Sequence, residues 1–250
     1  MNRKIFNQIQ ENLKQSFNLP KYRDVQASIN PNTIITSLPW TPKKQEKFIE
    51  SLNKIFDVDI DINMSLLNLT NNIDVKYSAR FWGSIWQPRT DVYQYTGWNI
   101  VERINNANPK AVLDVGCGFN QFKARIPNLI GIDAFNNSAD FMVDIFDYNV
   151  PNESYDHVIV FGSINFGNFN DINDRFKKVI DLTMPGGTIY VRANPGEVPK
   201  NGTWIDIYPW DFETAFKIAN LHNCKLESFK KDNGNRLYFE LRKNYLTPNA

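Results

Sequence analysis

Two short segments carry residues whose types and spacing could hold a nucleoside. In the sequence AVLDVGCGFN, an apolar run reaches Asp114 and is followed by Gly116 and Gly118. Glycines let the backbone turn tightly and approach a ligand where side chains would block it. Further along, Asp133 ends the apolar run of LIGID, where a carboxylate can accept hydrogen bonds from both hydroxyls of a ribose. The pattern predicts a nucleoside site at the carboxyl ends of two neighbouring strands.

A glycine loop and a following acid also occur in nicotinamide-dinucleotide domains, so the spacing has to separate the two kinds of site. A dinucleotide loop needs a third glycine three residues after Gly118, to bring helix and strand close beneath the pyrophosphate, but Gln121 stands there. Asp114, shortly before the glycines, is also unexpected for a dinucleotide site. The loop therefore favours a ligand with one nucleoside.

The segment 111–193 resembles the class I S-adenosylmethionine-dependent methyltransferases, and within them the compact type-11-like group. The resemblance rests on five motifs that occur in the same order: LDVGCGxN, GID, VDI, SYDHVIV and MPGG. It covers about a third of the chain, and the joint order of the motifs makes it specific. It implies S-adenosyl-L-methionine as the cofactor.

The resemblance also implies which residues hold that cofactor. It implies that the glycine loop, together with Asp114, holds the methionine part and that Asp133 holds the ribose. It implies adenine contacts after the third strand, through the carboxylate of Asp144 and the backbone N–H of Ile145. The full predicted cofactor set is Asp114, Gly116, Gly118, Asn120, Asp133, Ala134, Asp144, Ile145 and Phe161.

Two features depart from the family pattern. Asn120 stands where many members have a third glycine. Asparagine is the non-glycine residue that best tolerates left-handed backbone geometry, so the loop can keep its shape. The stretch between Asp133 and Asp144 is too short for a helix, and we expect a loop containing Asn136 and Asn137 between the second and third strands.

Candidate acceptor residues follow the fourth and fifth strands, at the edge where ligands bind in such sheets. They are Ser163, Asn165, Arg192 and Asn194, and Arg192 would suit a carboxylate or a phosphate on the acceptor. The sequence FGSINFGN stands where amino-group DNA methyltransferases have an NPPY-like motif, and no Pro-Cys pair offers the nucleophile of cytosine-C5 enzymes. No catalytic residue is assigned, because methyl transfer from a sulfonium needs chiefly alignment, and a general base only for a protonated nucleophile.

The elements that position these residues alternate as short apolar strands and helices, which predicts a Rossmann-like, doubly wound and mostly parallel α/β sheet. After Asp211 we expect a helix with Phe212, Ala215, Phe216 and Ala219 turned inward. Asn233-Gly234 is a strong hairpin signal and predicts an antiparallel pair at the sheet edge. The predicted strands are 112–115, 129–133, 141–145, 157–161, 188–192, 225–230 and 236–242, with a helix at 171–182.

A mainly helical segment is expected before this domain. Apolar residues from Ile5 to Phe17 recur at helical spacing, and Thr41 followed by Pro42 provides a cap and a first-turn proline for a second helix. The segment 77–98 is rich in aromatic residues that belong to a core, with a minority lining a ligand pocket. We therefore divide the chain into an N-terminal accessory segment, 1–75, and a methyltransferase domain, 76–250.

Composition narrows the class of partner. The 28 Lys and Arg residues nearly balance 27 Asp and Glu residues, so charge gives no strong nucleic-acid signal. The two cysteines have no metal-ligand spacing, and no apolar run is long enough for a membrane span. We expect a cytoplasmic protein without metal or membrane partners. A small-molecule acceptor is favoured, protein and RNA acceptors stay open, and the oligomeric state is not predicted.

Three other functions remain open. A non-catalytic S-adenosylmethionine-binding or scaffold protein would keep the fold and the cofactor without turnover. An NAD-dependent oxidoreductase would bind NAD instead. A lyase or hydrolase of S-adenosylmethionine would consume the cofactor without an acceptor.

Overall fold

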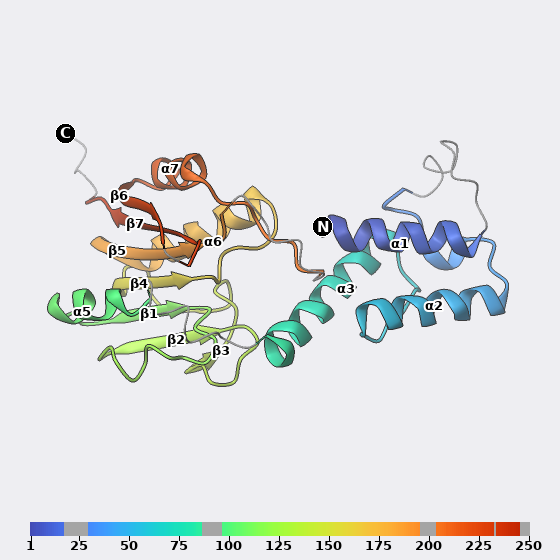
Figure 1. The fold of residues 1–250 in the computed structure, drawn as a ribbon, viewed down its shortest axis with the longest axis horizontal. Coiled ribbons are helices and arrows are strands. Elements are labelled where there is room, and N and C mark those ends of the chain that lie inside the picture. Colours follow the sequence, from blue (N-terminus) through green and yellow to red (C-terminus); the bar gives the residue numbers. More distant parts are fainter. Residues whose placement is uncertain (18–29, 87–96, 196–203, 233, 246–250) are drawn as a thin grey trace. The chain divides into compact units, whose positions relative to one another are not determined.

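The chain forms two compact units, shown in Figure 1. The structure is a computed structural model that describes residues 1–17, 30–86, 97–195, 204–232 and 234–245. One unit contains Met1–Ile85 and Asn201–Asp206, and the other contains Trp86–Lys200 and Ile207–Ala250. Helix α3 crosses the division that the sequence suggested between residues 75 and 76. Below, the two parts are called the helical unit and the sheet unit.

The helical unit confirms the expected helical N-terminus. Its helices are α1 (Arg3–Ser16), α2 (Pro42–Phe56) and α3 (Leu66–Arg80), with a 3-10 turn η2 (Ile35–Ser37) and a π-helical turn η3 (Phe81–Ile85). Thr41 caps α2 as predicted, since its side chain accepts a hydrogen bond from the backbone N–H of Lys44. Late in the chain, Trp204 packs on Phe56 with ring centroids 4.9 Å apart, and its carbonyl accepts a hydrogen bond from Asn2 Nδ2 at 2.6 Å.

The sheet unit is built on a seven-stranded sheet in the order β3-β2-β1-β4-β5-β7-β6 (Figure 1). The first five strands of that order are parallel, and β7 lies antiparallel between β5 and β6. The fold class predicted from the sequence is therefore confirmed. The bounds are β1 (Val112–Val115), β2 (Leu129–Asp133), β3 (Phe141–Met142), β4 (Tyr155–Phe161), β5 (Thr183–Ala193), β6 (Cys224–Lys231) and β7 (Leu237–Lys243).

Two strand predictions need comment. Strand β3 is shorter than the predicted 141–145, because Asp144 Oδ1 accepts the backbone N–H of Phe146 at 3.0 Å and turns the chain. The antiparallel hairpin is present as β6 and β7, although Asn233, the first residue of its expected turn, lies outside the described residues.

Helices cover the two faces of the sheet unequally. Helices α6 (Phe169–Leu182) and α7 (Phe212–Leu221) pack on one face, and α5 (Asn99–Asn106) packs on the other. Helix α7 buries Ala215, Ile218 and Ala219, whereas Phe212 and Phe216 are about half exposed. The predicted inward positions of Ala215 and Ala219 are confirmed, whereas those of Phe212 and Phe216 were wrong, because the small residues let this helix sit close to the sheet.

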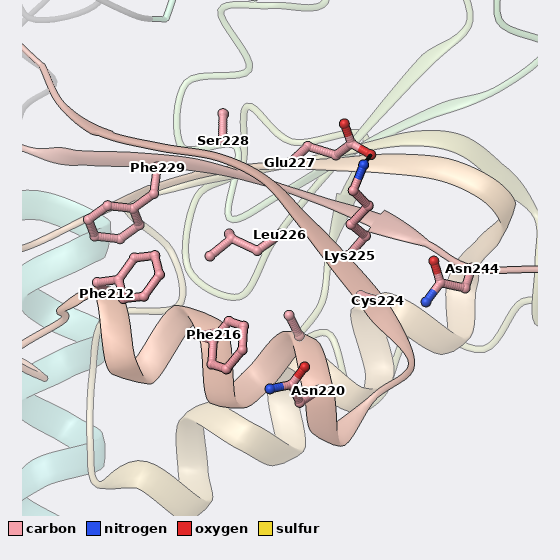
Figure 2. Close-up of a pocket in the computed structure, with 11 residues that line it drawn as sticks. Phe212, Phe216, Asn220, Cys224, Lys225, Leu226, Glu227, Ser228, Phe229 and Asn244 are labelled. Atoms are coloured by element: carbon pink, nitrogen blue, oxygen red, sulfur yellow. Dashed lines mark ion pairs between the residues drawn. The ribbon is translucent and has the colours of Figure 1, made fainter.

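Phe212 and Phe216 line a shallow groove between α7 and the edge strand β6. Figure 2 shows the two rings on α7, with Leu226 and Phe229 on the strand beside them. The groove has a volume of about 610 Å³. Strand β6 forms one edge of the sheet and β1 lies third from the other edge, so the groove is separate from the glycine loop that follows β1.

Loops connect β1, β2 and β3, and the expected absence of a helix between β2 and β3 holds for residues 134–140, all of which are described. Asp140 Oδ2 ties these connections together, accepting the backbone N–H of Gly131 at 2.8 Å and Lys123 Nζ at 3.1 Å. Among the described helices, none has both the length and the apolar character that crossing a membrane requires.

Candidate cofactor and acceptor site

The glycine loop lies directly beyond the end of β1, between the ends of β2 and β4. The N–H groups of Gly116 and Cys117 both donate to the carbonyl of Ile132, at 2.8 and 3.0 Å, which holds the loop against β2. Gly116 has a φ of 67°, and a Cβ added there would lie 2.2 Å from the Cβ of Ser163. The loop therefore requires glycine both for its left-handed backbone and for the close approach of the chain after β4.

Gly116→Ala is expected to destabilise the protein by roughly 2–5 kcal/mol, since left-handed geometry costs about 1–2 kcal/mol and overpacking about 1–3 kcal/mol. Gly162→Ala is the matched control: its φ is 81°, but the nearest atom to an added Cβ is 3.6 Å away. The control should lose only the backbone contribution. Urea midpoints measure both, and equal losses would show that the contact with Ser163 is unimportant.

The carboxylate of Asp133 joins the glycine loop to the end of β2. Its Oδ2 accepts the N–H of Gly118 at 2.9 Å, and its Oδ1 accepts the N–H groups of Phe135 and Asn136 at 2.9 and 3.0 Å. These bonds fix the carboxylate at the edge where the two loops meet. Ala134 follows directly and is half-buried.

Asp114 is a buried acid near the centre of the sheet, and only 2% of its surface is exposed. It pairs in register with Gly131 of β2 and Ile159 of β4. Burial, and then the negative charge of Asp133, raise the pKa of Asp114 to about 8. The acid is therefore mainly protonated at neutral pH, and a cation brought beside it would favour its ionised form.

Asn120 adopts the left-handed conformation expected where many methyltransferases have glycine, with a φ of 54°. Its Nδ2 donates to the carbonyl of Ser138 and to Asp140 Oδ2, both at 3.3 Å. Asn120 thus ties the glycine loop to the connection after β2. Cys117 is buried in the same loop, and burial raises the pKa of its thiol.

The predicted adenine positions follow β3. Asp144 Oδ2 is 2.9 Å from Arg175 Nη1 of α6, and the Arg175 guanidinium lies 4.9 Å from the centre of the Phe146 ring. The side chain of Ile145 is buried in the core, so its backbone is the part that can face a ligand. Arg175 was missed by the sequence reasoning, because nothing in a helical arginine indicates which distant carboxylate it reaches.

Two aromatic residues, Phe161 and Trp86, differ in what their rings contact. The Phe161 ring packs into the core between Phe122 and Tyr238, with centroids 5.8 and 6.3 Å away. Trp86 was not singled out from the sequence, yet its ring would be 3.2 Å from a Cβ on Gly118, and it stacks with Phe119 at 6.3 Å. The aromatic richness of 77–98 was the signal that could have found it.

The predicted acceptor residues gather at the ends of β4 and β5. Asn165 Oδ1 accepts the backbone N–H of Asn194 at 3.0 Å. Ser163 packs on the glycine loop through Gly116. Arg192 is only 5% exposed, and its Nε donates to Asp232 Oδ2 at 2.7 Å in a buried ion pair.

Comparison with solved structures places this arrangement. One match is a chain from the complex between the Haloferax volcanii Trm112 methyltransferase activator and a protein described as a methyltransferase. It superimposes with a TM-score of 0.53 at 12% identity, and the match covers 70% of this chain and 98% of that chain. The PH0226 protein of Pyrococcus horikoshii gives 0.50 at 16% identity, covering 66% and 96%. A 1,6-didemethyltoxoflavin-N1-methyltransferase of Burkholderia thailandensis gives 0.49 at 11%, covering 69% and 91%. No protein-family model and no curated protein sequence matches the chain.

The strand order, with antiparallel β7 placed beside β5, decides the fold class. The chain has the class I methyltransferase fold. A nicotinamide Rossmann domain has the order 3-2-1-4-5-6, without an antiparallel strand inserted beside the fifth. The predicted cofactor residues from Asp114 to Asp133 lie at the ends of β1 and β2 and on the loop between them, whereas the Ile145 side chain is buried in the core and the Phe161 ring packs against Phe122. Among the described residues, no three His, Cys, Asp or Glu side chains gather to hold a metal.

Proposed function

We propose that the protein transfers a methyl group from S-adenosylmethionine to a small-molecule acceptor. The observation that carries the proposal is the contact between Gly118 N–H and Asp133 Oδ2 at 2.9 Å, because it joins the loop after β1 to the acid that ends β2. These two strand ends are where a nucleoside binds in sheets of this kind. The class I methyltransferase fold supports the choice of cofactor.

The residues present fit that cofactor. Asp133 has the geometry to accept the ribose hydroxyls, and the backbone carbonyls of Gly116 and Gly118 can meet the methionine part. Buried Asp114 lacks a cationic partner in the hydrogen bonds and ion pairs of the described residues, and an α-ammonium would provide one. Asp144 and the Ile145 N–H offer an acceptor and a donor to the adenine edge.

The chain's part in the reaction is alignment. Bound cofactor supplies a methyl group on a positively charged sulfur, which a nucleophile can attack directly. The ends of β4 and β5 would hold the acceptor beside the glycine loop, since Ser163 touches Gly116. Holding two reactants in line lowers the barrier without a general base when the nucleophile is already deprotonated.

The acceptor class and the compartment are also part of the proposal. A formal net charge of +1 gives no general attraction for polyanions, which favours a small molecule. Cys117 and Cys224 are both free and buried, which is compatible with a reducing cytoplasm.

Calorimetric titration with S-adenosylmethionine, S-adenosylhomocysteine and NAD tests the proposal. We expect saturable binding of the first two and none of NAD. Binding of NAD alone would contradict it. Incubation with methyl-labelled S-adenosylmethionine and fractionated small metabolites then separates the alternatives: cofactor consumed without any metabolite indicates a lyase or hydrolase, and binding without consumption indicates a scaffold.

A further inference from the structure

Three polar groups at the predicted acceptor edge have no hydrogen-bond partner among the described residues. They are Ser163 Oγ, Asn165 Nδ2 and Arg192 Nη2, and each atom is buried. We call these three residues the donor cluster. Asn165 and Arg192 are 1% and 5% exposed. Buried polar groups are normally paired, and unpaired ones call for an explanation.

The three residues of the donor cluster lie at or just beyond the adjacent ends of β4 and β5, and Ser163 borders the glycine loop. Ser163 Oγ lies 3.2 Å from the position of a Cβ on Gly116. Gly162 donates its N–H to the carbonyl of Arg192 at 2.8 Å, which ties the end of β4 to β5. The space above Gly162, where a Cβ would stand, is 3.9 Å from Asn165 Nδ2 and 3.6 Å from Arg236 Nη2. N–H donors from two connections thus approach one space.

A purely structural role explains only part of this arrangement. The Arg192–Asp232 ion pair attaches the chain after β6 to β5, and Asp232 Oδ1 also accepts the N–H of Arg236 at 2.9 Å. If the guanidinium served only for that attachment, its remaining buried N–H groups would donate hydrogen bonds to protein oxygens. Nη2 stays unpaired, and so does the amide of Asn165 on the neighbouring connection. Leaving donors of a buried cation unpaired costs stability unless a ligand pairs them.

Two of the three unpaired groups, Asn165 Nδ2 and Arg192 Nη2, are N–H donors, so a ligand that pairs with them must offer oxygen acceptors. A carboxylate suits a guanidinium nitrogen and an amide nitrogen, because it is planar and carries two acceptor oxygens. The ionised Asp232 on the same guanidinium would repel a dianionic phosphate more strongly than a monoanion. Resting on the proposed methyltransferase function, we propose that the methyl acceptor carries a carboxylate, bound by Asn165 Nδ2 and Arg192 Nη2 beside the glycine loop.

Chemical-shift titration of the ¹⁵N-labelled protein, with and without saturating S-adenosylhomocysteine, tests this inference with acetate as the probe. We expect saturable shifts of the Asn165 side-chain amide and the Arg192 Nε–H. Acetamide, which has a similar shape but no charge, should bind at least about tenfold more weakly, since charge-assisted hydrogen bonds are the stronger ones. Asn165→Asp keeps an oxygen for the Asn194 N–H but replaces the donor with a negative charge, and it should abolish acetate binding. Asn220→Asp, an exposed change on α7, is the matched control.

The outcomes separate the two proposals. Equal binding of acetate and acetamide, tighter binding of phosphate than of acetate, or unchanged acetate binding in Asn165→Asp would each overturn the carboxylate assignment. Cofactor binding is read independently from the backbone amides of Gly116 and Gly118. Their failure to respond to S-adenosylhomocysteine would overturn the proposed function, whereas their response without acetate shifts would overturn the carboxylate alone.

Discussion

Asp133→Ala is expected to weaken S-adenosylhomocysteine binding by at least about 100-fold, because two hydrogen bonds to a charged acceptor are lost at about 1.5–3 kcal/mol each. The same change frees the N–H groups of Gly118, Phe135 and Asn136, so the glycine loop should loosen as well. Calorimetric titration gives the affinity and thermal unfolding gives the loop's contribution to stability.

Asp133→Asn separates recognition from support. Its remaining amide oxygen can still accept N–H groups of the following turn, but it offers the ribose one acceptor in place of a carboxylate. We expect a smaller loss of thermal stability than in Asp133→Ala, because one of the two oxygens that hold the loops is kept, with affinity reduced by about tenfold or more. Asp147→Ala, an exposed change after β3, should leave the affinity unchanged. Normal binding by both Asp133 variants would remove this residue from the cofactor site.

Asp114→Asn is expected to stabilise the protein at high pH while weakening cofactor binding. The pKa of Asp114 is about 8 in the folded protein, raised by burial and by Asp133, whereas an unfolded aspartic acid ionises near a pH of about 4. Between these values the folded state keeps a proton that the unfolded state has released. Raising the pH therefore lowers the free energy of unfolding, by about 1.4 kcal/mol per pH unit for this group.

Asparagine resembles the protonated acid but does not titrate, so the difference between the two proteins should grow as the pH rises. From pH 5 to pH 8 we expect the variant to gain roughly 4 kcal/mol over the original protein, measured by urea unfolding. Asp147→Asn, the same change at an exposed aspartate, supplies the control. Identical profiles for Asp114→Asn would show that this acid ionises normally. Weaker S-adenosylhomocysteine binding by the more stable variant would identify the buried charge as a cost of function.

The sheet could be predicted closely because short local sequence patterns mark its strands. The apolar runs ending at Val115 and Asp133 are bounded by glycines or by a polar loop, and both strands have the predicted bounds. The orientation of α7 could be predicted only in part, since both its alanines and its phenylalanines were expected to face inward. Phe212 and Ala215 are both apolar, and only packing against the sheet decides that alanine faces inward.

In the site, too, features set by a single residue could be predicted, whereas contacts between distant residues could not. The left-handed conformation of Asn120 followed from its residue type, since asparagine tolerates a positive φ. The partners of Asp144 and Arg192 did not follow, because Arg175 and Asp232 are distant in sequence and meet them only through the fold. The sequence showed which predicted residues lie at the ends of β1 and β2. It did not show which of the predicted residues are already bound to other side chains.

The order in which the chain is synthesised has a consequence for the helical unit. Trp204 packs on the core that contains Phe56, and its carbonyl accepts a hydrogen bond from Asn2. Residues 1–85 therefore leave the ribosome without the piece that completes their core, and at ordinary elongation rates that piece follows on the order of ten seconds later. During that interval the nascent helices expose apolar surface, so chaperone binding to ribosome-bound chains should peak before residue 204 emerges and fall after it.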